Sequence, residues 1–482
     1  MDHTTEQHQK SQPGSDRDAS DHGSSDHGSS DHGSSDHGSS DRALSVDDAR
    51  TRVVVIGGGL AGLTAAIVAA RGGAAVTVLD TRRIGGRAAT TVVDPGVVFN
   101  GGPRAFYAGG PGRSVLEELD IHPLGASPDT STGRVVRDGV LHPLLGRPVS
   151  LLRTQLLSSR SKFAAAKLLG RLGSLDTEAV AGRSVTQWMG DHRFAQDLRE
   201  LLAMLIRTST YCSDLDSLSA DAAVGQLQHA LGEGVRYLDG GFQQIVDALA
   251  GAASAAGVQV VDHTRVSEVA AAAPTERALG RWAIRSASGV VHADAVVLAC
   301  GGPESIASLS PVPLDLSGLG PAATAACLEL AVRGPIPQPI LLGCGEPLYL
   351  SVHQPPADLA PTGISVVHAM RYGARSGPED SDQLWNLAAI GGITPDEVVA
   401  HRFLHRMVVT GGTPIASAGG MVGRPAVRVR GTEGLFLAGD WVGPVGMLAD
   451  GSLVSGREAG TAAAAVPAAH GRTSATACSV TR

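Results

Sequence analysis

The sequence predicts an α/β protein whose parallel sheet is assembled from segments far apart in the chain. Three stretches carry this prediction: a strand, helix and strand over residues 52–80, a hairpin leading into a buried strand over residues 282–299, and an apolar strand at residues 435–438 before a small-residue helix. At 482 residues the chain exceeds the usual size of one domain, so it has room for one large core or two interleaved domains.

The composition argues against several classes of protein. The five cysteines are scattered, form no CxxC pair and leave an odd one over, which suits reduced thiols and supports neither a zinc site nor a disulfide framework. A net charge of −8, without a basic run interleaved with aromatics, argues against nucleic acid as a partner. No apolar run reaches the roughly eighteen residues of a membrane span, and no signal pattern is found. We therefore expect a cytoplasmic protein.

The first fifty residues differ from the rest. DHGSS occurs four times in tandem from Asp21 to Ser40, in a stretch nearly free of large apolar residues, which predicts a disordered low-complexity tail over residues 1–50. The repeated histidines have no fixed geometry, so a solvated tail is favoured and no metal site is predicted. Residues 471–482 are expected to form a flexible C-terminus.

The first ordered segment reads RVVVIGGGLAGLTAAIVAARGGAAVTVLD. A β-branched strand meets a glycine turn, an alanine-rich helix follows, and a second strand ends in an acid. In this G-x-G-x-x-G pattern the first glycine permits a tight turn, the second lets the backbone approach a pyrophosphate, and the third lets helix and strand pack closely. The pyrophosphate would lie at the positive end of the helix and the acid would bind a ribose. The predicted dinucleotide contacts are Gly57, Gly59, Leu60, Ala61, Gly62, Asp80 and Thr81.

A second glycine-rich stretch identifies the cofactor. Gly85, Gly86 and Arg87 follow the acid-tipped strand, and residues 100–104 read NGGPR. Together with the fingerprint, these motifs resemble the flavin-dependent amine oxidase superfamily, which includes phytoene desaturases and protoporphyrinogen oxidases. The resemblance implies FAD as the cofactor, with Gly86, Arg87, Gly101, Gly102, Pro103 and Arg104 among its contacts.

Two central blocks fit the same resemblance. A glycine pair at residues 240–241 precedes a helix over 242–250 and strands at 258–261 and 266–269, and in the family Val266 would lie over the adenine end of FAD. A hairpin turning at Ser288-Gly289 then leads into an apolar strand at residues 295–299, where the family's flavin-binding domain resumes.

The last block reads LFLAGDWVGPVGMLADGSLVSGREAG. Its Gly-Asp pair resembles the family's GD motif, whose carboxylate holds the ribityl-phosphate part of FAD. No cysteine that could form a covalent bond to the flavin adjoins this pair, so we expect noncovalent FAD. We expect Asp450 to cap the next helix, which would direct its positive end at the flavin. One face of that helix is nearly bare and can press against cofactor or sheet. The predicted contacts are Gly439, Asp440, Gly446, Met447 and Leu448, the last two beside the isoalloxazine.

The resemblance implies a discontinuous Rossmann-like FAD-binding domain with an inserted α+β substrate-binding domain. The FAD-binding domain would comprise residues 52–130, 235–303 and 427–470. The substrate-binding domain would comprise residues 132–234 and 304–425, which match the family only loosely.

The implied activity is FAD-dependent dehydrogenation by hydride transfer to flavin N5, for which the protein supplies orientation and electrostatics. Arg104, Tyr107 and Trp441 fall in segments that approach the flavin, and no catalytic residue is assigned. Amine-oxidising members hold a lysine near N5 and a pair of aromatics, whereas this chain has three lysines and 3% aromatics. This favours the desaturase and porphyrinogen-oxidase branches and a small, largely apolar, lipophilic substrate.

Three alternatives stay open. A flavin-dependent amine oxidase remains one of them. An NAD(P)H-dependent flavin hydroxylase is another, because such enzymes can lack the second nucleotide fingerprint that is missing here. A nonenzymatic flavin-fold binding protein is the third, because a fold does not fix a function.

Residues 151–172 contain leucines at near-helical spacing interleaved with basic residues. A basic amphipathic helix can lie on an anionic membrane and admit a lipophilic substrate, which would make the protein peripherally membrane-associated. The same pattern more often reflects core packing beneath a solvated face.

Overall fold

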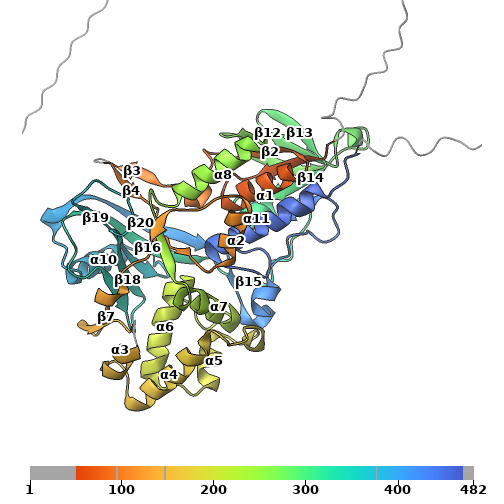
Figure 1. Cartoon of the computed structure of the whole chain (residues 1–482). Coiled ribbons are helices and arrows are strands. Elements are labelled where there is room, and N and C mark those ends of the chain that lie inside the picture. Colours follow the sequence, from red (N-terminus) through yellow and green to blue (C-terminus); the bar gives the residue numbers. More distant parts are fainter. Residues whose placement is uncertain (1–49, 94–95, 146–147, 376, 470–482) are drawn as a thin grey trace, which may run out of the picture. The chain divides into compact units, whose positions relative to one another are not determined.

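The computed structural model describes residues 50–469 except 94–95, 146–147 and 376 (Figure 1). The predicted disordered tail, apart from Arg50, and the predicted flexible C-terminus at 471–482 lie outside these residues, as does the metal question raised by the repeated histidines. The described residues belong to one compact unit. Within them, no helix combines the length and apolar character needed to cross a bilayer.

A five-stranded parallel sheet joins the two ends of the described chain (Figure 1). Its strand order is β10, β2, β1, β14 and β22. Val54 of β1 lies opposite Thr77 of β2 on one side and Val296 of β14 on the other, in a sheet whose valine-rich strands are largely buried. The predicted α/β class and the parallel sheet of distant segments are confirmed. The strands are β1 (Arg52–Ile56), β2 (Ala75–Leu79), β10 (Gln259–Val261), β14 (Ala295–Leu298) and β22 (Leu435–Leu437).

Two helices of this part pack unusually closely, α1 (Leu60–Arg71) and α11 (Leu448–Ala464). A Cβ at Gly456 would lie 2.4 Å from the carbonyl oxygen of Ala61, and one at Gly460 would lie 2.4 Å from that of Ala65. The nearly bare face predicted for the last helix therefore presses against α1. The neighbouring helices are α2 (Pro111–Glu118), α8 (Gln243–Ala255) and α9 (Pro303–Leu309).

Smaller sheets surround this core. The predicted hairpin is present, with Ser286 of β12 opposite Gly289 of β13. Asp294, which follows it, accepts hydrogen bonds from the backbone N–H groups of Arg52 and Ala469 and so ties the first strand to the end of the described chain. The strands are β11 (Val266–Ala271), β12 (Trp282–Ser286) and β13 (Gly289–Ala293) in one sheet; β3 (Thr91–Val93) and β4 (Val97–Phe99) in another; and β5 (Phe106–Tyr107), β6 (Gly125–Ala126) and β9 (Val235–Leu238) in a third.

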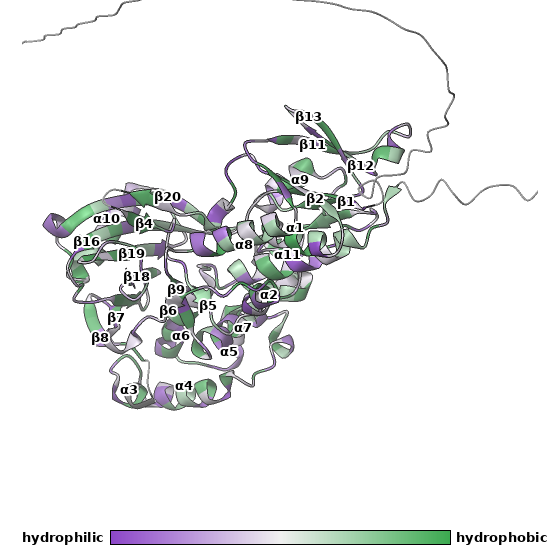
Figure 2. Cartoon of the chain, turned by 45° about the horizontal axis from the view of Figure 1, so that its top comes forward, coloured by the Kyte–Doolittle hydropathy of each residue, from purple (hydrophilic) through white to green (hydrophobic). Residues whose placement is uncertain are grey.

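The inserted part is built on a seven-stranded mixed sheet in the order β20, β16, β19, β18, β17, β7, β8 (Figure 2). Successive residues of β16 serve opposite faces: Leu328 packs toward α10 (Pro378–Ile390), and Cys327 packs into the cluster that contains helices α4 to α7. The inserted α+β part is thereby confirmed, and its exact boundaries stay predictions. The strands are β7 (Arg134–Arg137), β8 (Val140–Pro143), β16 (Ala323–Arg333), β17 (Ile340–Gly343), β18 (Leu348–Gln354), β19 (Ile364–Tyr372) and β20 (Val398–Thr410); the helices are α5 (Val185–Asp191), α6 (Gln196–Thr210) and α7 (Ala220–Leu231).

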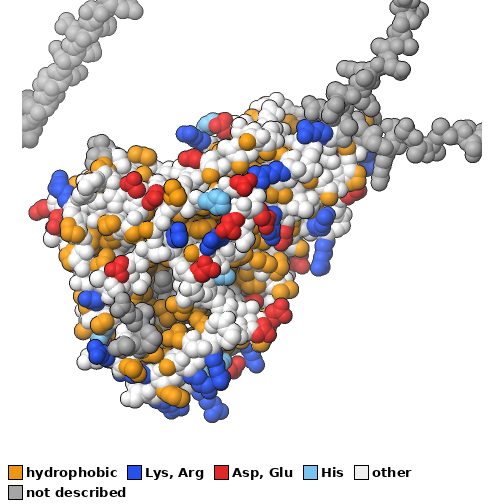
Figure 3. Space-filling view, viewed as in Figure 1, with side chains coloured by type: hydrophobic (Ala, Val, Ile, Leu, Met, Phe, Trp, Pro, Cys, Tyr) orange, Lys and Arg blue, Asp and Glu red, His pale blue; other side chains and the backbone are white. Residues whose placement is uncertain are grey.

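The basic, leucine-rich stretch at residues 151–172 belongs to two helices, α3 (Pro148–Arg153) and α4 (Ser159–Leu172). Ser158 caps α4 by accepting the N–H of Ser161. Five of the eight large apolar side chains in this stretch are buried, namely Leu151, Leu156, Leu157, Leu168 and Leu172, whereas Leu152, Phe163 and Leu169 are exposed. Hydrophobic and basic side chains lie side by side over α3 and α4 (Figure 3). Core packing therefore explains only part of the pattern.

We predict that Gly456→Ala destabilises the protein by about 1–3 kcal/mol, because its Cβ would overlap the backbone of α1. Gly170→Ala in α4 is the matched control: no atom lies within 4 Å of its Cβ, and alanine favours the helix by up to about 1 kcal/mol. Thermal unfolding should show a lower melting temperature for Gly456→Ala and an equal or higher one for Gly170→Ala than for the parent protein. Equal melting temperatures for both variants would contradict the close packing of α1 and α11.

Candidate functional site

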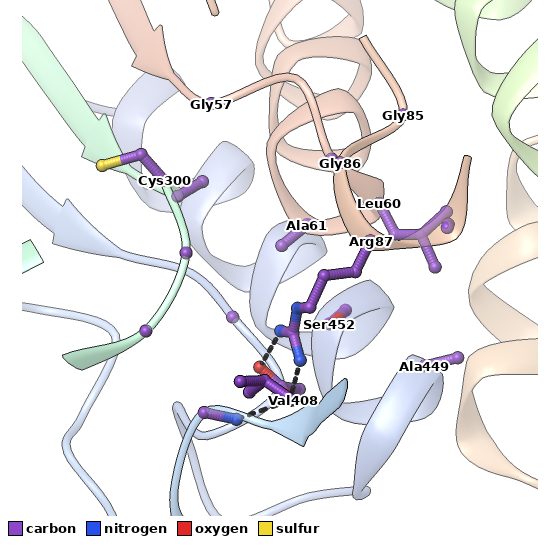
Figure 4. Close-up of a pocket in the computed structure, with 18 of the residues that line it drawn as sticks. Gly57, Leu60, Ala61, Gly85, Gly86, Arg87, Cys300, Val408, Ala449 and Ser452 are labelled. Carbon is purple, nitrogen blue, oxygen red and sulfur yellow. Dashed lines mark hydrogen bonds and ion pairs between the residues drawn. The ribbon is translucent and has the colours of Figure 1, made fainter. Parts of the chain in front are cut away.

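A cavity of about 570 Å³ lies at the carboxyl ends of the parallel strands (Figure 4). Gly57 follows β1, Asp80 follows β2, Gly301 follows β14 and Gly439 follows β22, and all four line the cavity. Open α/β sheets bind their ligands at this edge. The cavity is therefore the candidate functional site.

The glycine turn after β1 leaves open space where a phosphate must pass. Gly57 has φ +109°, and a Cβ there would lie 2.5 Å from the carbonyl oxygen of Ala299. A Cβ at Gly62 would lie 1.8 Å from the carbonyl oxygen of Gly57, so helix and turn touch. A Cβ at Gly59 would meet nothing within 4 Å. Helix α1 begins directly after Gly59 without a side-chain cap, so its first N–H groups are available to an anion.

Asp80 is fixed beside this turn. Its Oδ2 accepts the N–H of Gly58 at 2.7 Å, and its Oδ1 accepts the N–H of Arg82 at 2.9 Å. Each carboxylate oxygen retains a lone pair that can accept from a ribose hydroxyl. Thr81 and Val266 line the same part of the cavity.

Arg87 connects the second glycine motif to the last block of the chain (Figure 4). Its Nη2 lies 2.6 Å from Oδ1 of Asp440, and its Nη1 lies 3.1 Å from Oδ2, so the pair is bidentate. Nη1 also donates to the carbonyl oxygen of Val409, while the N–H of Gly411 donates to Asp440. Burial alone would raise the pKa of Asp440, and Arg87 reverses this and holds it below its usual value.

The carboxylate of Asp440 is therefore occupied by protein donors on both oxygens. The expected carboxylate contact with the ribityl-phosphate stays a prediction. The backbone of the preceding Gly439 is fixed by Ser455 of α11, whose hydroxyl forms hydrogen bonds of 2.9 Å with both the N–H and the carbonyl oxygen of Gly439.

Arg104 places a half-buried cation in the wall of the cavity. Its Nε donates to the carbonyl oxygen of Asn100 at 2.8 Å, and it forms no ion pair with any carboxylate among the described residues. Burial, helped by the charge of Arg87, lowers the pKa of Arg104 to about 10, so the guanidinium remains charged at neutral pH.

Glu329 of β16 supports this loop from the inserted sheet. Its Oε1 accepts the N–H of Gly102 at 2.9 Å, and its Oε2 accepts Nε of Arg402 at 2.6 Å. Burial disfavours its charge, but the hydrogen bonds and positive partners prevail, and the pKa of Glu329 falls to about 2. Gly102 and its neighbour Gly101 thus position the loop without lining the cavity themselves.

The start of α11 differs from expectation in two ways. Asp450 does not cap α11, because its Oδ1 accepts the N–H of Gly112 in α2 at 3.1 Å. Met447 is the N-cap residue of α11, and no side chain accepts a hydrogen bond from the first N–H groups of this helix as a cap. A side chain in the first turn of one helix has here satisfied the free amide of another. Met447 is buried in the core of the inserted part, whereas Leu448, with φ +55°, lines the cavity.

Most of the predicted contacts do meet at this cavity. Those that line it are Gly57, Gly59, Leu60, Ala61, Asp80, Thr81, Gly86, Arg87, Pro103, Arg104, Val266, Gly439, Asp440 and Leu448. Those that are not part of its wall are Gly62, Gly101, Gly102, Gly446 and Met447. Trp441 is fully buried and donates to the carbonyl oxygen of Gly301.

Several wall residues belong to no recognisable sequence motif, notably Tyr211, Phe242, Cys300, Val408 and Ala449. Of these residues, only Phe242 adjoins a sequence feature that could have pointed to the cavity, the glycine pair at 240–241. Tyr211 follows α6 with φ +59° and donates to the carbonyl oxygen of Pro103, a strained position typical of functional sites.

All five tyrosines of the chain gather in this region. Tyr107 and Tyr211 line the cavity, and the ring of Tyr211 lies edge-on to Tyr372 with centroids 6.0 Å apart. Tyr372 contacts Tyr349, whose hydroxyl lies 3.3 Å from that of Tyr237. A low overall aromatic content therefore does not mean a site without aromatics.

These features fit FAD. Open space in front of Gly59 and free amides at the start of α1 suit the pyrophosphate, and the Asp80 carboxylate suits the adenosine ribose. The fold and site define an FAD-dependent oxidoreductase. The family model for flavin-containing amine oxidoreductases matches residues 60–464, and the chain belongs to this family.

Solved structures share the fold at low sequence identity. Putrescine oxidase bound to putrescine matches with a TM-score of 0.66 and 16% identity, over 86% of this chain and 98% of that one. An oxidoreductase from Methanosarcina mazei matches at 0.62 and 19%, over 84% and 99%. Cyclohexylamine oxidase from Brevibacterium oxydans matches at 0.61 and 15%, over 86% and 99%. A comparison of the sequence with curated proteins finds no match.

We predict that Gly59→Val leaves the fold intact but weakens FAD binding by about tenfold or more, because the new side chain enters the space before α1, where its Cβ has no protein atom within 4 Å. Gly251→Val, on an exposed position of α8 with equally open surroundings, is the control. FAD titration of the apoprotein measures both. If the Gly59→Val and Gly251→Val variants bound FAD with equal affinity, the pyrophosphate of FAD would not pass Gly59.

The buried carboxyl of Asp450 should make stability depend on pH. Burial raises its pKa to about 7, above its unfolded value of about 3.9, so its contribution to stability is lost as the pH rises between these values, by an amount on the order of 4 kcal/mol. Asp450→Asn should therefore be more stable than the parent at pH 8, with the difference largely gone at pH 5. Chemical denaturation at both pH values tests this, and a difference independent of pH would contradict it.

Proposed function

We propose that the protein dehydrogenates a small, largely apolar molecule that is neutral or anionic, with FAD as the electron acceptor. The observation that carries this proposal is the half-buried guanidinium of Arg104 in the wall of the cavity, which forms no ion pair with a described carboxylate. A substrate ammonium would be repelled there, whereas a carboxylate or an electron-rich neutral group would be attracted.

The other wall residues support an apolar substrate. Phe242, Val408 and Leu448 give the cavity apolar surface, and neither of the two described lysines, Lys162 and Lys167, lines it. Burial raises the pKa of Tyr211 far above its usual value, so its hydroxyl stays neutral. Asp450 also lines the cavity, and with its pKa raised by burial to about 7 it is partly protonated at neutral pH.

Each part of the site then has a defined task. Bound FAD supplies a two-electron acceptor, and the protein orients the substrate bond against it. Arg104 fixes the polar end of the substrate, while Tyr211 and Leu448, both held at positive φ, limit how the substrate can lie.

Amine oxidation is the second candidate. The clustered tyrosines favour it, because aromatic rings attract cations. Putrescine oxidase and cyclohexylamine oxidase share the fold, although their low identity carries no substrate information. The positive charge of Arg104 is the reason that we rank amine oxidation second.

Anaerobic mixing separates the candidates. We expect the flavin absorbance to be bleached by neutral polyenes or hydroaromatic carboxylic acids and not by primary amines, and Arg104→Gln to slow bleaching by the carboxylic acids about tenfold or more. Arg104→Lys should restore part of the rate because it keeps the charge. Bleaching by amines that Arg104→Gln accelerates would contradict the proposal, and bleaching by NADPH alone would favour a hydroxylase.

A further inference from the structure

The two helices α3 and α4 present a surface that the flavin chemistry does not use. One side of α4 is committed to the core: Ser161, Ala165, Leu168 and Leu172 are buried at helical spacing and pack with the hydrophobic cluster of the inserted part. The opposite side faces solvent.

Three large apolar side chains of the two helices are exposed to solvent, one on α3 and two on α4. Phe163 is 76% exposed, Leu152 is 70% exposed and Leu169 is 41% exposed. Lys162 joins the two helices, because its Nζ donates to the carbonyl oxygen of Leu152 at 2.9 Å. We call these three side chains, with the basic residues around them, the α3–α4 face.

The charged residues of α3 and α4 are all basic, and Asp197 of α6 is an acid that lies beside them, where it accepts hydrogen bonds from Ser158 and Ser161. Residues 139–175 contain no aspartate or glutamate, in a chain whose net charge is −8. None of the face's cations forms an ion pair with a described residue. Figure 3 shows blue and orange side chains interleaved over these helices. The cations are Arg153, Arg160, Lys162, Lys167 and Arg171.

We propose that the α3–α4 face docks on the surface of a lipid bilayer that contains anionic lipids. Phe163 and Leu152 enter the boundary between headgroups and acyl chains, and the surrounding cations meet lipid phosphates. Exposed apolar side chains flanked by lysine and arginine are the arrangement that interfacial helices use. Each basic residue near an anionic surface adds to the attraction, so the five cations together with the exposed apolar side chains suffice for reversible binding.

The charge pattern favours a lipid over a second copy of the chain. Two copies of this face would bring only positive charges together, which disfavours a symmetric dimer. The proposal is independent of the substrate proposed above, because it rests on surface residues outside the cavity.

The residues substituted to test this proposal must be exposed, so that the substitutions leave the core intact. Leu156 and Leu157, the conspicuous leucine pair of the sequence, are buried, and polar substitutions there would damage the core. Phe163→Ser with Leu152→Ser removes the apolar contacts, and Lys162→Glu with Lys167→Glu reverses charge. Val422→Ser, at a position 75% exposed outside this face, and Arg277→Glu are the matched controls.

The experiment is flotation of the purified flavoprotein with vesicles of phosphatidylcholine alone or mixed with phosphatidylglycerol. We expect binding only to the mixed vesicles, a decrease with salt, and an approximately tenfold or larger loss in both double variants but not in the controls. The flavin spectrum and melting temperature of each variant verify its fold.

Two results would overturn the proposal. One is an absence of flotation of the parent protein with phosphatidylglycerol vesicles. The other is flotation that the double variants leave unchanged. A dimer in vesicle-free solution that both double variants dissociate would reassign the face to self-association.

Discussion

The ion pair between Arg87 and Asp440 is the interaction on which the site depends. It joins the turn after the first dinucleotide unit to the end of the last sheet strand, 353 residues later, and the same guanidinium binds Val409 of the inserted sheet. A buried carboxylate is tolerated only when it is paired, so losing either partner leaves an uncompensated charge. The cavity is therefore complete only when all three segments have folded against one another.

The glycines of α1 and α11 give this arrangement its second support. Because Gly456 and Gly460 let the two helices meet at backbone distance, the starts of both helices come to the same end of the sheet. Leu60 and Leu448 consequently line one cavity, although they belong to opposite ends of the chain. Glu329 adds a third support by fixing the loop at Gly102 from the inserted sheet.

Local patterns made the sheet and the nucleotide turn predictable. A β-branched strand, three spaced glycines and an acid at the next strand end leave few alternatives, and the distant strand at 435–437 is short, apolar and followed by Gly-Asp. The other features of the site depend on tertiary contacts that no local pattern predicts. Asp450 had a plausible amide in its own helix, yet it bonds to Gly112, over three hundred residues away in the sequence. The gathering of five scattered tyrosines, and the place of Tyr211, depend on inserted segments that carry no motif.

The central claim is that these distant blocks enclose one FAD. The most direct measurement is the absorbance spectrum of the purified protein, with the cofactor released by heat or acid and quantified. The account predicts a yellow protein that releases about one FAD per chain without proteolysis, as a site with one fingerprint and noncovalent binding requires. A colourless protein that takes up no added FAD would contradict it.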